Sequence, residues 1–270
     1  MFFKQLEPEK IGQKKPHVKE GRIAVRYAFR GAQKPQVSGG EFSGPFSFYG
    51  TERPLVKKGL FSGDLCFYAA NKGLVQGGEF TGKSAFMGSH DTKVEDGSFS
   101  GEWAFCESNE ALVSGGAFSG FEAFTESNQT RIQGGEFTGS LFGLLAKGML
   151  ITGGRFTGDQ ALRGSVQALV LGGEFFGERT FVEAEQLLLV LDRHLEEVVL
   201  PKSGVLAVRS IGKLIRDPDK PGNALVLALE VGQGKEHARI VSAEDLPLGV
   251  KDPALALAAL EELKKKFGRS

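Results

Sequence analysis

A phenylalanine recurs every 19 residues over most of this chain, and the spacing never slips. Eight copies keep it without insertion or deletion, namely Phe42, Phe61, Phe80, Phe99, Phe118, Phe137, Phe156 and Phe175. One glycine stands two positions before each of these residues, and another stands two positions after it. A fixed period of this length is typical of a solenoid, in which each repeat is one coil that packs against the next.

Three further columns follow the same period. A second aromatic column begins at Phe48, a column of small residues at Thr51 and an aliphatic column at Val56. Several glycines in every coil argue against a helix, because each costs about 1 kcal/mol there, and β-branched residues favour strands. We therefore predict coils of three short strands joined by tight turns, stacked about 4.8 Å apart, with the recurring glycines at positive φ.

One coil departs from the pattern in an informative way. Gly143 stands where the second aromatic column needs a ring, and Phe142 precedes it. We expect the Phe142 ring to fill the same space from one position earlier, because a closely packed core tolerates no empty ring site.

The predicted fold is all-β: a right-handed single-stranded parallel β-helix of about eight 19-residue coils with a C-terminal strand and helix cap. Left-handed solenoids are commonly built from hexapeptides, and 19 is not a multiple of six. Residues 1–35 are expected to form an N-terminal cap with an incomplete coil at Ile23–Phe29. Residues 36–195 are the coils, and 196–270 are a cap of strands and a final helix that Asp252 and Pro253 open. The whole is one structural domain.

Charge and cysteine content narrow the class of function. The chain has 33 basic and 33 acidic residues, so it offers no general attraction for nucleic acid or a membrane surface. Cys66 and Cys106 lie two coils apart, too far for a disulfide, and free thiols suit a reducing compartment. The start shows no signal peptide, and no apolar run could span a membrane. We expect a soluble cytoplasmic protein with no metal and no cofactor, because its four histidines are scattered and no phosphate-binding fingerprint is present.

The stretch Leu200–Asp217 resembles the closing motif of a bacterial family of right-handed β-helix proteins known only as a domain of unknown function. The matching positions are Pro201, Ser203, Gly204, Ala207, Ser210, Ile211, Gly212 and Ile215. Gly177–Phe181 resembles that family's coil motif as well. Gly-Gly and Ala-Phe pairs replace the family's usual Asn-Cys and Trp-Tyr pairs, so the chain is identified as a divergent member. The resemblance implies a right-handed solenoid and carries over no activity and no catalytic residue.

Two glutamates are candidate catalytic residues. Glu107 and Glu126 occupy the same column one coil apart, and paired carboxylates perform acid–base chemistry when their surroundings split their pKa values. The alternative interpretation is an ordinary solvated row of glutamates.

A second group suggests binding. Trp103 and Phe121 lie in adjacent coils outside the aromatic columns, with Glu102 and Glu122 beside them. Exposed aromatic rings bind sugars or a partner protein, although such rings also pack beneath loops. Further rings off the main columns are Phe46, Tyr49 and Tyr68.

The sequence therefore favours a non-catalytic β-helix scaffold or binding protein, working as a homo-oligomer or with a protein partner. The first alternative is a carbohydrate-active enzyme, a polysaccharide lyase or hydrolase that uses carboxylates on one face. The second is a β-helix subunit of a larger enzyme complex, comparable to the Gly-repeat domain of glutamate synthase, which this chain resembles in repeat style only.

Overall fold

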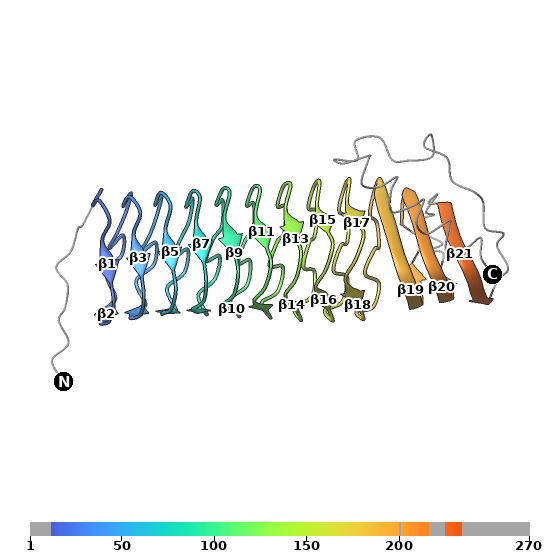
Figure 1. The fold of residues 1–270 in the computed structure, drawn as a ribbon, viewed down its shortest axis with the longest axis horizontal. Coiled ribbons are helices and arrows are strands. Elements are labelled where there is room, and N and C mark those ends of the chain that lie inside the picture. The colour runs from blue at the N-terminus through green and yellow to red at the C-terminus, as the bar shows by residue number, and fades with distance from the viewer. Residues whose placement is uncertain (1–11, 200, 216–224, 234–270) are drawn as a thin grey trace.

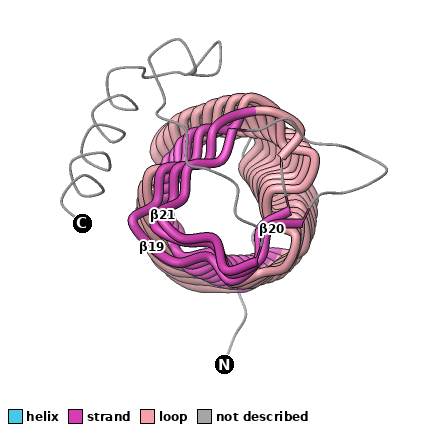
Figure 2. The backbone as a smooth tube through the Cα atoms, turned by 90° about the vertical axis from the view of Figure 1, so that its right-hand side faces the viewer, coloured by secondary structure: helices cyan, strands magenta, loops and turns pink. Residues whose placement is uncertain are grey.

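The computed structural model is a rod of stacked coils (Figure 1). The structure describes residues 12–199, 201–215 and 225–233. Viewed along the rod, the coils superimpose in a single closed outline (Figure 2). Nine coils are present, because each adds one strand to a nine-stranded parallel sheet.

Twenty-one strands make up the described part of the chain, and all but the last three are two residues long. Their bounds are β1 His17–Val18, β2 Arg22–Ile23, β3 Gln36–Val37, β4 Glu41–Phe42, β5 Leu55–Val56, β6 Leu60–Phe61, β7 Leu74–Val75, β8 Glu79–Phe80, β9 Lys93–Val94, β10 Ser98–Phe99, β11 Leu112–Val113, β12 Ala117–Phe118, β13 Arg131–Ile132, β14 Glu136–Phe137, β15 Leu150–Ile151, β16 Arg155–Phe156, β17 Leu169–Val170, β18 Glu174–Phe175, β19 Leu187–Val199, β20 Gly204–Ile215 and β21 Leu225–Gln233.

The strands form two parallel sheets that run the length of the rod. Odd-numbered strands β1 to β19, followed by β20 and β21, form a twelve-stranded sheet, and the even-numbered strands β2 to β18 form a nine-stranded one. Phe80 pairs with Phe99, and Phe99 pairs with Phe118, so neighbours in the sheet are 19 residues apart. The predicted all-β parallel solenoid and its period are confirmed.

The third side of each coil is a turn, where we expected a strand. In the second coil this segment takes positive φ at Phe46 (55°) and at Gly50 (60°), whereas a strand needs negative φ throughout. The turns of adjacent coils still bond to each other, as the Phe48 N–H does to the Cys66 carbonyl at 2.7 Å. We call residues 45–50 and their equivalents at 19-residue intervals the turn face.

Stacked rings fill the core. The rings of Phe61 and Phe80 lie parallel with centroids 4.7 Å apart, and those of Phe67 and Phe86 with centroids 4.8 Å apart. Phe80 also meets Phe86 edge to face at 5.3 Å, which joins the two aromatic columns. All four rings are fully buried. Each buried ring contributes roughly 2–3 kcal/mol, and each aromatic pair adds about 0.5–1.5 kcal/mol.

Phe142 replaces the missing ring as predicted. Its side chain is buried, and its ring centroid lies 5.0 Å from that of Phe124 and 4.5 Å from that of Phe137. At position 143 a Cβ would approach Leu162 Cδ2 to 2.9 Å and Met149 Cε to 3.2 Å. The space of a second-column ring is therefore already taken.

The two glycine columns have different causes. Gly78 has a φ of 114°, and its column shows the positive φ that we expected. Gly101 represents the other column, in which φ is not positive. A Cβ on Gly101 would overlap the carbonyl oxygen of Gly82 in the preceding coil, so this column is required by close approach between coils.

Regular stacking begins earlier than the eight phenylalanines indicate. Residues 14–32, where an incomplete coil was expected, contain β1 and β2, which pair with β3 and β4 in the same register as later strands. Ile23 and Phe29 are buried at the head of the two aromatic columns.

At the other end of the rod, β19 pairs with β17, and β20 and β21 continue that sheet in parallel (Figure 1). The strand expected at 237–243 and the helix expected after Asp252 lie outside the described residues. Within the described ranges there is no helix long and apolar enough to cross a membrane.

Candidate functional site

The turn face brings all of the predicted site residues together. The Trp103 N–H bonds to the Phe121 carbonyl at 2.9 Å, and the Glu107 N–H bonds to the Thr125 carbonyl at 2.9 Å. These bonds hold the fifth and sixth coils in register along the turn. The six predicted residues on these two turns are Glu102, Trp103, Glu107, Phe121, Glu122 and Glu126.

Two of the four glutamates hold other side chains in place. Trp103 Nε1 donates a hydrogen bond of 2.8 Å to Glu122 Oε2. Lys83 Nζ lies 2.8 Å from Glu102 Oε2 and 5.5 Å from the centroid of the Trp103 ring. Its hydrogen bond to Glu102 raises the pKa of Lys83. Glu102 and Glu122 thus fix a cation and an indole on the surface.

Glu107 and Glu126 are exposed at the edge of the turn. Both border a hollow of about 620 Å³ that Asn128, Leu145 and Lys147 also line. The hollow therefore has carboxylates on one bank and an amide and an ammonium group on the other. Such a surface can bind polar groups by hydrogen bonds. The described residues contain no cluster of three or more His, Cys, Asp or Glu side chains able to hold a metal ion.

Aromatic rings cover the turns of the first three coils. The ring centroids of Tyr27 and Phe46 lie 5.2 Å apart, and those of Tyr49 and Tyr68 lie 5.6 Å apart. All four rings are half-buried, so each keeps an exposed part. Phe121 extends the series to the sixth coil and is 42% exposed.

Two arginines lie over these rings. The guanidinium of Arg26 lies 4.9 Å from the Tyr27 ring centroid, and that of Arg30 lies 5.5 Å from the Tyr49 centroid. Tyr27 and these arginines were not among the residues predicted to bind. They occupy the repeat positions of Phe46, Pro45 and Tyr49 one coil earlier, so extending the period by one coil would have found them.

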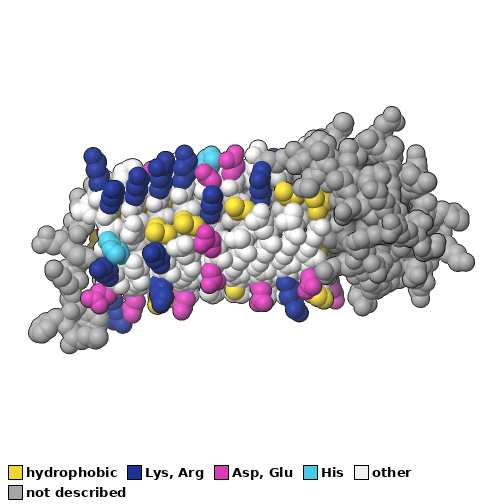
Figure 3. Space-filling model, in the orientation of Figure 1, with side chains coloured by type: hydrophobic (Ala, Val, Ile, Leu, Met, Phe, Trp, Pro, Cys, Tyr) yellow, Lys and Arg dark blue, Asp and Glu magenta, His cyan; other side chains and the backbone are white. Residues whose placement is uncertain are grey.

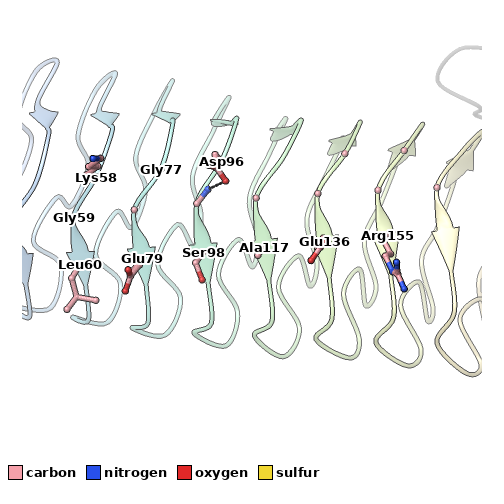
Figure 4. A pocket seen from close by; sticks show the side chains of 18 of the residues that line it. Lys58, Gly59, Leu60, Gly77, Glu79, Asp96, Ser98, Ala117, Glu136 and Arg155 are labelled. Carbon is pink, nitrogen blue, oxygen red and sulfur yellow. Dashed lines mark hydrogen bonds between the residues drawn. The ribbon is translucent and has the colours of Figure 1, made fainter.

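A groove forms a second surface, along the side of the rod. It has a volume of about 1150 Å³, and its floor is made of consecutive Gly-Gly pairs such as Gly134 and Gly135. One bank is the row of outward residues Glu79, Ser98, Ala117, Glu136 and Arg155 (Figure 4). The sequence showed the glycine pairs but gave no sign of a groove.

One coil shows what the floor of this groove can bind. The Gly97 N–H donates a hydrogen bond of 2.8 Å to Oδ1 of the neighbouring Asp96. Most other coils have glycine in place of Asp96, which leaves their backbone open to the groove (Figure 4). The groove can therefore accept an extended chain with hydrogen-bond acceptors.

Neither cysteine is an activated nucleophile. Both are free, with Cys66 buried and Cys106 half-buried. Burial raises the pKa of the Cys66 thiol to about 12. Burial and the nearby carboxylates of Glu107, Glu126 and Glu122 raise that of Cys106 to about 11. Nucleophilic thiols have lowered pKa values instead.

The fold and these surfaces define a β-solenoid repeat protein with an aromatic and charged turn face and a glycine-floored groove. No protein family, no curated protein and no solved structure matches the chain.

Proposed function

We propose that this chain is a non-catalytic scaffold that binds a protein partner through the turn face. The observation that carries the proposal is the run of partly exposed rings from Tyr27 to Phe121, interleaved with Arg26 and Arg30. Aromatic residues and arginine are enriched in protein interfaces and at the points that contribute most to binding. A monomeric protein rarely exposes such a continuous apolar strip without using it.

The surroundings of the carboxylates support a non-catalytic role. A general acid needs a site that keeps its proton near neutral pH, usually an apolar pocket. Glu107 and Glu126 are exposed, while Glu102 and Glu122 bond to Lys83 and Trp103.

One observation favours a carbohydrate-active enzyme as the second candidate. Glu107 and Glu126 border the same hollow, which is the arrangement that a lyase or hydrolase would use. Incubation with acidic and neutral polysaccharides tests it, with new reducing ends and unsaturated products as the readouts. Turnover that Glu107→Gln or Glu126→Gln abolishes, and that the matched Glu79→Gln does not affect, would overturn our proposal.

Binding through the turn face has its own test. A photoreactive benzophenone side chain placed at Phe121 should give cross-linked adducts of defined mass. The same group placed at Ser100, which is exposed on a different column, should give none. Equal cross-linking at both positions, or none at either, would contradict the proposal.

The proposal also includes the finer points of class and location. The motif at Pro201–Ile215 supports a right-handed coil and a divergent relationship to the bacterial β-helix family of unknown function. The two free thiols support a reducing compartment such as the cytoplasm. A subunit of a larger enzyme complex would use the same turn face for its contacts.

A further inference from the structure

We infer that the turn face binds the turn face of a second copy of this chain, with the two rods antiparallel. This inference rests on the proposed role of the turn face as a binding surface and names its partner. Six coils take part: residues 14–32, 33–51, 52–70, 71–89, 90–108 and 109–127. The two-fold axis lies between the third and the fourth of them.

Charge is distributed unevenly along the turn face. The first coil carries Arg26 and Arg30, both exposed. The fifth and sixth coils carry Glu107 and Glu126, also exposed, together with the half-buried Glu122. Lys and Arg side chains also gather over the first half of the rod on the side shown in Figure 3. One end of the strip is thus basic and the other acidic.

An antiparallel pair places these opposite charges against each other. The two-fold axis brings the first coil against the sixth, the second against the fifth and the third against the fourth, and each column of the turn face meets itself. Arg26 then faces Phe121 next to Glu122, and Arg30 faces Thr125 next to Glu126. Each arginine gains a carboxylate, and Arg26 also gains a ring.

The inner coils match in the same way. Phe46 faces Trp103, and Tyr68 faces Met87, so apolar surface meets apolar surface. Asp64 and Lys83, which are exposed and opposite in charge, also face each other. Across the six coils no pair of like charges meets on the turn face.

Other arrangements of two copies lose this match. A parallel pair in register sets each arginine against its own copy and each glutamate against its own copy, which is repulsive. A parallel pair shifted by five coils joins the charges but leaves free ends, so it grows into an open filament.

The contact has a modest size. Six coils span about 29 Å at the usual strand spacing, and six residues of turn span at most about 20 Å. The product, about 600 Å² on each partner, is at the lower end for specific interfaces. We therefore expect a dimer with a dissociation constant in the micromolar range, weakened by salt because its ion pairs are at the surface.

Charge reversal with mixing tests the pairing, with mass measured by light scattering or sedimentation from low to high micromolar concentration. The chain should dimerise, and Arg26→Glu/Arg30→Glu should be monomeric, as should Glu107→Lys/Glu126→Lys. A one-to-one mixture of the two variants should restore the dimer, because each contact again joins opposite charges. The matched controls Lys57→Glu/Lys58→Glu and Glu79→Lys/Glu136→Lys, on other columns, should dimerise like the unchanged chain.

Cross-linking tests the direction. In the antiparallel pair, position 49 faces the native Cys106 of the other copy. A short bismaleimide should therefore join two copies of Tyr49→Cys and should fail with Tyr49→Cys/Cys106→Ser. The unchanged chain should not cross-link, since its two Cys106 residues are three coils, about 14 Å, apart. In a parallel pair they would face each other and react.

The results separate this inference from the proposed function. A monomer at every concentration, a mass that grows beyond two copies, or a mixture that stays monomeric would overturn the dimer. If the unchanged chain is monomeric and the group at Phe121 still captures a different protein, the binding role stands and only the self-pairing fails. Circular dichroism of each variant checks that the β fold is kept.

Discussion

The rings of Phe80 and Phe99 lie face to face across one coil, with centroids 4.6 Å apart and planes 4° from parallel. Phe99 has the same relation to Phe118 on its other side, again at 4.6 Å and 4°. Each ring in the middle of the column therefore contacts two others through both faces. The stability of the rod depends on an unbroken series of such contacts between neighbours.

Replacing one ring should be costly. Phe99→Ala should lower the free energy of unfolding by about 3–5 kcal/mol, because it leaves a ring-sized cavity between Phe80 and Phe118. Phe121→Ala is the control and should cost well under 1 kcal/mol, since that ring is 42% exposed. Urea unfolding followed by circular dichroism measures both. Equal losses would mean that the column is not the main source of stability.

The two kinds of glycine should respond differently to alanine. Gly101→Ala should cost about 3 kcal/mol, because its Cβ would push against the Gly82 carbonyl of the preceding coil. Gly50→Ala should cost only about 1 kcal/mol for the positive φ, since a Cβ there meets nothing within 4 Å and Ala69 occupies the equivalent position one coil later. Melting temperatures of the two variants give the comparison, and the reverse order would contradict the close-approach explanation.

The irregular coil allows a compensation experiment. Phe142→Ala should cost about 3–5 kcal/mol, and Gly143→Phe alone should destabilise by crowding Leu162 and Met149. Phe142→Ala/Gly143→Phe should be more stable than the sum of the single losses predicts, because one ring again fills one site. A double-mutant cycle measures this coupling. Strict additivity would show that the two positions do not share the space.

The buried thiol should make stability depend on pH in the alkaline range. The pKa of Cys66 is raised from 9.0 to about 12 in the folded chain, so the folded state keeps a proton that the unfolded state loses. The stabilisation is therefore complete below about pH 9 and is lost as the pH rises towards 12, by about 1.4 kcal/mol per pH unit. Cys66→Ala should lose less stability over this range, and Ala85 and Ala104 show that its column accepts alanine. Parallel alkaline decline in both proteins would refute the assignment.

The sequence predicted the sheets well because the repeat is also the pairing register. Phe80 and Phe99 are 19 residues apart in the chain and directly opposite in the sheet, so finding the period gave the contacts. The third side was predicted wrongly. Phe46, Trp103 and Glu107 all have positive φ, and none is a glycine, so composition gave no sign that the backbone turns there.

The site was only partly predictable for related reasons. Trp103, Phe121 and the four glutamates do lie together on the turn face. Tyr27 was missed because the first coil has Ile23 and Val25 in place of the marker phenylalanine and glycine, which hides the repeat. The groove was missed because it is made by absent side chains, and its width depends on how far the banks stand apart in space.

The constant coil length has a consequence for distance. Tyr27 and Glu122 occupy the same column five coils apart, about 24 Å along the axis, and each intervening coil adds one equal step. Deleting residues 71–89 would remove one step and still leave a phenylalanine column in which every ring meets another. The rod therefore works as a molecular ruler, on which the gap between surface groups changes by whole coils without any redesign of the interior.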